Sequence, residues 1–217
     1  AKTGVTGLGI LAVAIAAMAL PARESVGAML LTLIGGDIFA VLFYRRSADW
    51  SHLLRLFPWA AAGVVVGALT LWLGRIDNDG ARRMIGVILL ILIAADFFRR
   101  WGQKGKPDAL PTALQNKWAS GLTGIVAGFT TMVANAAGPV MTLYLLAARL
   151  PKYAFLGTSA WFFLILNLFK IPFSVGLGMI TWESAGISLR MLPFIMAGAL
   201  TGRWLVRYID ERRFVQI

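Results

Sequence analysis

The chain has 217 residues and contains no cysteine, which excludes disulfide bonds, thiolate metal ligands and cysteine nucleophiles. It is 59% hydrophobic and only 14% charged, with a mean hydropathy of +0.74, which excludes a soluble domain of this size. The net charge of +11 does not indicate nucleic-acid binding, because the cations lie in short loops between apolar stretches, where they set membrane topology and contact anionic headgroups.

Eight apolar segments follow one another along the chain, and we expect each to be helical. The first four are residues 8–20, 25–44, 53–73 and 82–98. After a polar stretch that contains Pro107 and Pro111, the last four are residues 118–134, 139–148, 154–175 and 184–206. Two segments, 8–20 and 139–148, are too short to cross a bilayer, which takes about 20 residues. The sequence therefore predicts an all-α polytopic membrane protein with broken or re-entrant helices.

The two halves of the chain repeat one pattern of prolines, glycines and polar residues. Three pairs are 130 residues apart: Pro21 and Pro151, Gly27 and Gly157, and Asp37 and Asn167. Three more pairs are 135 residues apart: Pro58 and Pro193, Gly63 and Gly198, and Gly67 and Gly202. A duplicated membrane unit of this kind is typical of secondary transporters.

We expect a first repeat at residues 1–98, a cytoplasmic linker at 99–117 and a second repeat at 118–217. The cations of the linker place it in the cytoplasm by the positive-inside rule, although the arginine-rich loop between segments 53–73 and 82–98 then falls outside. Each repeat lacks one helix that the other has, so we expect the native protein to extend by about one helix at each end. Each complete repeat would then have five elements, and an odd number inverts the second copy.

The break between segments 118–134 and 139–148 is the first candidate binding feature. Asn135 suits a helix cap or near-cap position, and Pro139, which follows Gly138, suits the first position of a helix. A helix that begins at mid-membrane presents unpaired N–H groups and a partial positive charge, which favour an anion.

The matching feature of the first half lies at the start of the chain. It is rich in small residues and includes Lys2, Thr3, Gly7 and Gly9. The two helix starts are predicted to meet near the bilayer centre and to bind an anion there. The alternative is that both are glycine-kinked turns that only aid packing, and that Lys2 is an ordinary interfacial lysine.

Polar side chains inside the apolar segments are the remaining candidates. Charged groups at a helix centre cost about 2.5–3.5 kcal/mol on insertion scales, so Asp37 and Lys170 need a partner or a purpose. One interpretation is a buried Asp37–Lys170 pair that pins the repeats together. The other is that Asn167 and Lys170 bind an anion while Asp37 carries a proton. Thr158 and Ser159 are further candidates, as hydroxyl donors along the pathway.

The residues that carry the duplication also carry a family resemblance. The first half shows Lys2-Thr3-Gly4, then Gly7-Leu8-Gly9, Gly36-Asp37, Arg45-Arg46 with Asp49-Trp50, and Pro58-Trp59. The second half shows Asn135 with Gly138-Pro139, Tyr144-Leu145-Leu146, Gly157-Thr158-Ser159-Ala160, and Asn167 with Lys170. Over most of its length the chain resembles TauE/SafE-type sulfite exporters.

The resemblance implies a multi-pass permease of the bacterial inner membrane for sulfite, sulfonates or related anions. We expect alternating access between two inverted repeats, with proton coupling and a homodimer as further hypotheses. An anion channel and a permease for another small organic acid remain open as alternatives. A membrane-embedded enzyme is disfavoured, because His52 is the only histidine and lies in a loop. We expect no metal and no cofactor. A non-transporting membrane scaffold is the last alternative, and a dry, packed centre would distinguish it.

Overall fold

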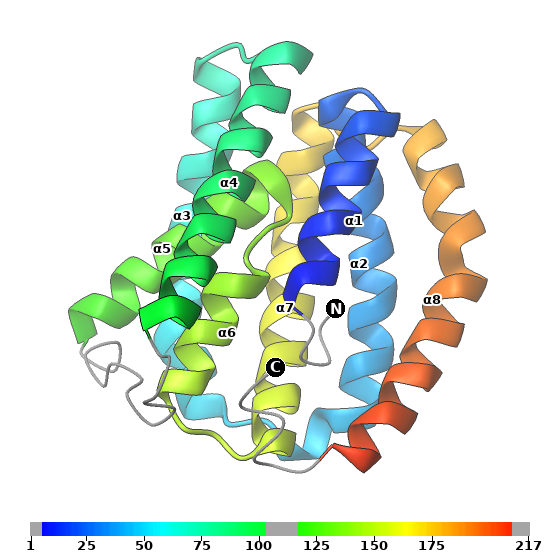
Figure 1. Cartoon of the computed structure of the whole chain (residues 1–217). Helices are drawn as coiled ribbons and strands as arrows, with labels where there is room; N and C mark the ends of the chain where they lie inside the picture. Colours follow the sequence, from blue (N-terminus) through cyan, green and yellow to red (C-terminus); the bar gives the residue numbers. More distant parts are fainter. Residues whose placement is uncertain (1–5, 103–116, 210–217) are drawn as a thin grey trace.

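The computed structural model describes residues 6–102 and 117–209, and these form an all-α bundle (Figure 1). The helices in chain order are α1 Thr6–Ala19, α2 Ala22–Tyr44, the short 3₁₀ helix η1 Arg45–Ser47, α3 Trp50–Leu73, α4 Asn78–Gly102, α5 Lys117–Ala134, α6 Gly138–Ala147, α7 Lys152–Gly176 and α8 Trp182–Tyr208. All eight predicted helical segments are therefore confirmed. Residues 103–116, which make up most of the predicted linker, lie outside the described part.

Four of the described helical stretches are long and apolar enough to cross a membrane. They are Ala22–Ser47, Trp50–Leu73, Lys152–Gly176 and Trp182–Tyr208. Three shorter apolar helices accompany them, at Gly9–Ala19, Trp118–Ala134 and Gly138–Ala147. The prediction of an all-α polytopic membrane protein is confirmed, and so is the shortness of α1 and α6.

Most of the helices begin a few residues before the apolar segments that predicted them, because their first turns are polar. The Asp49 side chain accepts hydrogen bonds from the backbone N–H groups of Ser51 and His52, so α3 begins at Trp50. The side chains of Thr181 and Ser184 cap each other's backbone at the start of α8. At the other end of the first half, α4 continues to Gly102, four residues into the predicted linker.

Helices α3 and α5 pack so closely that their backbones touch. Added Cβ atoms at Gly63 and Gly128 would overlap the backbone carbonyl groups of Ile125 and Ala60, respectively. The G-x-x-x-G spacing in α3 and α5 is therefore a packing device, as small residues at membrane helix interfaces generally are.

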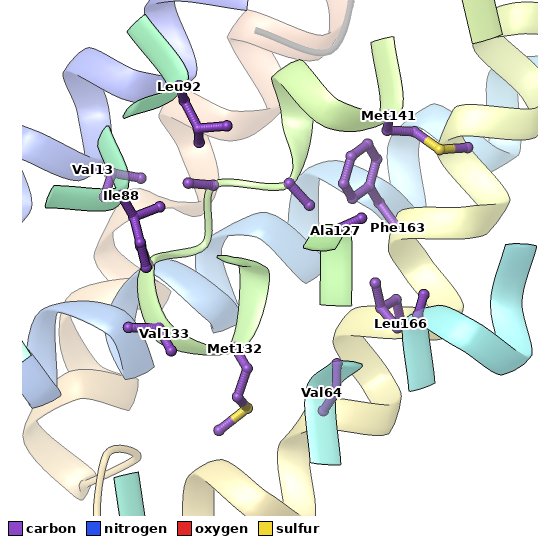
Figure 2. Packing of buried hydrophobic residues seen from close by; sticks show 14 of the residues in the cluster. Val13, Val64, Ile88, Leu92, Ala127, Met132, Val133, Met141, Phe163 and Leu166 are labelled. Atoms are coloured by element: carbon purple, nitrogen blue, oxygen red, sulfur yellow. The ribbon is translucent and has the colours of Figure 1, made fainter. Parts of the chain in front are cut away.

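Helix α2 lies between α7 and α8, in contact with both and with α1 (Figure 1). Gly27, near the start of α2, packs against the backbone of Met179 in the loop after α7. Gly157, near the start of α7, packs in the same way against the backbone of Tyr44, the last residue of α2, and of Ser47 just after it. Figure 2 shows part of the apolar core, where buried side chains from several helices surround the break between α5 and α6.

Candidate anion site at the helix breaks

The site is built around the break between α5 and α6. Helix α5 ends at Ala134, and Asn135 follows in the left-handed region with φ of 50°. Asparagine tolerates this conformation better than most residues, which explains why it stands here. The Asn135 N–H still donates to the Thr131 carbonyl at 3.0 Å, and the chain then turns into α6 at Gly138. Pro139, in the first turn of α6, has no N–H that would need a partner.

A cavity of about 80 Å³ lies between the starts of α1 and α6. Gly9 and Ile10, from the first part of α1, form one side of the cavity. Asn135, Gly138 and Pro139, from the break between α5 and α6, form another side. A Cβ atom at Gly138 would meet nothing within 4 Å, so the backbone there faces open space. Residues near the starts of α1 and α6 therefore border one small space, and its role as an anion site stays a prediction.

One stripe of α7 forms a third wall of the cavity. Its members follow one another at intervals of four residues: Phe155, Ser159, Phe163 and Asn167. Residues spaced by four lie on the same face of a helix. The Asn167 side chain is buried, 1% exposed, and its Nδ2 atom donates to Asp37 Oδ2 at 2.7 Å. Within the described part of the chain, Asn167 Oδ1 has no hydrogen-bond partner.

Lys170 lies one turn beyond Asn167 on α7 and is completely buried. Its ammonium group donates to the Thr131 carbonyl at 2.7 Å, to Thr131 Oγ1 at 3.1 Å and to Asn135 Oδ1 at 2.6 Å. These bonds use all three of its donors. The Asn135 Nδ2 atom in turn donates to the Val26 carbonyl of α2 at 2.8 Å. Lys170 therefore holds the helix break in place from behind.

The predicted direct pair between Asp37 and Lys170 is wrong. Asp37 is fully buried and bonds to Asn167, whereas Lys170 bonds to Thr131 and Asn135. Among the described residues these two charged side chains form no ion pair with each other, so Asp37 of α2 bonds to α7 through Asn167 and not through Lys170.

The other predicted site residues fall in different places. Ser159 lines the cavity, but Thr158 does not, because its hydroxyl oxygen accepts a hydrogen bond from the Asp49 backbone N–H at 2.8 Å. Gly7 belongs to the first turn of α1. Lys2 and Thr3 lie outside the described residues.

Sequence reasoning missed several residues of the cavity wall. They are Leu33, Thr131, Ala136, Thr142, Phe155 and Phe163, as well as Ile10 of α1. The signal for three of them was available. Counting back from Asn167 in steps of four reaches Phe163 and Phe155, as well as Ser159, which was predicted. Thr142 follows Gly138 at the same interval. Adding the residues at four-residue intervals from Asn167 and from Gly138 would have extended the predicted site to these side chains.

Of three comparisons with known proteins, one gives a match to this chain. No curated protein and no solved structure gives a significant match to the chain. Among protein families, the one described as Sulfite exporter TauE/SafE matches residues 1–217, which is the whole chain. With its membrane-spanning helices and paired short helices, the chain belongs to the sulfite exporter TauE/SafE family, a family of membrane permeases for anions and not of enzymes.

Proposed function

We propose that this protein is a secondary transporter that carries a small sulfur-containing anion, sulfite or an organosulfonate, across the bacterial inner membrane. The observation that carries the proposal is the cavity of about 80 Å³ bordered by the starts of α1 and α6 and by the Asn167 side chain. A pocket of that size accepts an ion of a few heavy atoms. A scaffold protein would have no reason to keep polar groups around such a space, because buried polar groups without partners are costly.

The positive character of the site has two sources. The helix starts contribute N–H groups and the positive ends of their dipoles. Lys170 contributes a full charge behind Asn135, at 2.6 Å from the Asn135 Oδ1 atom. Because all three of its donors are used, we assign Lys170 the role of a positioning residue that attracts the anion through its charge, without touching it.

We further propose that the two halves are inverted repeats that rock against each other to alternate access. Three matched features support this. Pro21 and Pro151 precede α2 and α7 with similar backbone angles. Gly27 packs on the loop after α7 as Gly157 packs on the end of α2. Asp37 and its counterpart Asn167 bond to each other, as expected for equivalent residues at a two-fold axis.

The same pair provides a mechanism for proton coupling. With the Asp37 carboxylate ionised, Asn167 turns its NH₂ group to Asp37, and its oxygen is left without a hydrogen-bond partner among the described residues. Because Asn167 lines the cavity, this oxygen would repel an anion bound there. When Asp37 binds a proton, the acid can donate to Asn167 Oδ1 instead. The amide then turns its NH₂ group toward the anion, because an amide has one accepting and one donating end. Proton binding and anion binding would therefore favour each other.

Uptake of radiolabelled sulfite into proteoliposomes tests the proposal. We expect saturable uptake that increases with an inward proton gradient, and its loss in Asn167→Ala. Ser174→Ala is the matched control, because Ser174 is a buried residue of α7 whose hydroxyl has no partner in the described part and does not line the cavity. Flux that does not saturate and ignores the gradient would indicate the alternative, an anion channel. Uptake of carboxylates but not of sulfite or sulfonates would indicate a permease for another small acid.

A further inference from the structure

A second cavity, of about 200 Å³, lies at the end of the bundle where α2 finishes, α7 begins and α8 finishes (Figure 1). Its polar lining comes from Tyr44, Ser47, Tyr153, Arg203 and Arg207. It shares no residue with the cavity at the helix breaks. The transport proposal does not use it.

The chemistry of this cavity suits a phosphate group. Both arginines are exposed, and the Arg203 guanidinium group lies 4.6 Å from the centre of the Phe43 ring, which orients it. The Tyr44 hydroxyl is buried and has no hydrogen-bond partner among the described residues. Leaving such a group unpaired is costly, and Tyr44 belongs to the wall of this cavity, so an oxygen acceptor bound there could take its hydrogen bond. Arginine is the side chain best matched to phosphate oxygens.

An apolar groove of about 290 Å³ adjoins this cavity and runs between α2 and α8. The groove and the cavity share Phe43, Tyr44 and Arg203. Small residues line the groove: Gly36 and Ala40 from α2, and Gly198 and Ala199 from α8. From Arg203 the groove reaches Ile195, and from Tyr44 it reaches Thr32. At 1.5 Å per residue these spans are about 12 and 18 Å, which is close to half the hydrocarbon thickness of a bilayer.

We propose that the cavity and the groove together bind one anionic phospholipid, with its phosphate group between Arg203, Arg207 and Tyr44 and an acyl chain between α2 and α8. The groove favours a lipid over a free phosphate ion, because an acyl chain can pack against its apolar wall and a free phosphate ion has no such chain. The positive-inside rule places the end of α8 in the cytoplasm, where the membrane leaflet is rich in anionic lipids.

Lipid binding by the purified full chain in an uncharged detergent tests the proposal, with native mass spectrometry as the readout. We expect phosphatidylglycerol to bind at least about tenfold more tightly than phosphatidylcholine. We expect the double variant Arg203→Gln/Arg207→Gln to lose about tenfold or more of that affinity, because hydrogen bonds to charged groups contribute on this scale. The double variant Arg45→Gln/Arg46→Gln is the control, since it removes the same charge from exposed residues near the same end that do not line the cavity. Equal losses in both double variants would overturn the proposal.

Two further variants separate a lipid from a soluble ion. A Cβ atom at Gly198 would meet nothing within 4 Å, so Gly198→Leu fits the fold but fills the groove. We expect it to weaken phosphatidylglycerol binding severalfold. Tyr44→Phe should weaken the lipid without lowering the thermal stability of lipid-free protein, because the hydroxyl has no partner in the described structure. Lipid binding that survives Gly198→Leu unchanged, together with full competition by inorganic phosphate, would show a soluble-anion site and would overturn the proposal.

Discussion

Replacing Asp37 with Asn should remove the part of the pH dependence of anion binding that comes from the Asp37 carboxyl group. In the wild type, ionised Asp37 holds the NH₂ group of Asn167 at 2.7 Å, and Asn167 Oδ1 is left without a partner in the described structure. An asparagine at position 37 has both a donor and an acceptor at all pH values. It can therefore pair with either orientation of the Asn167 amide, which leaves the NH₂ group of Asn167 free for the anion.

The size of the effect follows from one hydrogen bond. A hydrogen bond to a charged group contributes about 1.5–3 kcal/mol, which corresponds to roughly a 10- to 150-fold change in dissociation constant. We expect the wild type to bind the anion more weakly by about this factor when Asp37 is ionised than when it is protonated. In Asp37→Asn the affinity should stay close to the tighter, low-pH value.

Isothermal titration calorimetry with methanesulfonate is the suitable assay, because a sulfonate stays ionised across the pH range, whereas sulfite itself titrates. Asp49→Asn, which changes an acid outside the cavity, is the control and should behave like the wild type. Lys170→Met is measured in the same series, because Lys170 is the other buried charged side chain beside the helix break. An Asp37→Asn variant that keeps the full pH dependence of the wild type would refute the reasoning.

Three further predictions concern the packing and the framework of the site. Gly128→Ala should lower the free energy of unfolding in detergent by about 1–3 kcal/mol or more, because its Cβ would overlap the Ala60 carbonyl. The control Gly186→Ala on α8, with open space around it, should leave the free energy of unfolding unchanged. Asp49→Ala should destabilise the protein by about 0.5–2 kcal/mol at neutral pH through loss of a helix cap. Hydrogen bonding, chiefly from the Ser51 side chain, lowers the Asp49 pKa from 3.8 to about 2, so this difference should fade as the pH falls through that range, and a constant difference would contradict it. Lys170→Met should keep its helical content in circular dichroism, since the Lys170 ammonium group bonds to Thr131 and Asn135 and not within its own helix, yet it should weaken sulfonate binding at least about tenfold by calorimetry.

The sequence predicted the helices well because membrane spans leave a strong apolar signal and because prolines and glycines mark their ends. It also predicted that the starts of α1 and α6 belong to one site. Residues near both starts do border one cavity, while its role as a binding site stays a prediction. The matching residues of the two halves, such as Asp37 and Asn167, made it possible to relate these two distant segments.

The partners of buried polar groups could not be predicted in the same way. Lys170 is three residues from Asn167, and the apolar pattern cannot say whether its long side chain reaches Asp37 on α2 or Asn135 at the helix break. That choice depends on the angle between helices, which close contacts such as that of Gly128 with Ala60 help to set. The role of Thr158 was missed for the same reason, because its partner, the Asp49 backbone, is 109 residues away.

The position of the bound anion is the measurement that tests the central claim most directly. Selenite is a heavier relative of sulfite, and its selenium atom can be located by anomalous scattering in crystals of the protein. The account predicts one selenium peak in the cavity between Gly9, Gly138 and Asn167, and its loss in crystals of Asn167→Ala. A peak elsewhere in the bundle, or an empty cavity at saturating selenite, would contradict it.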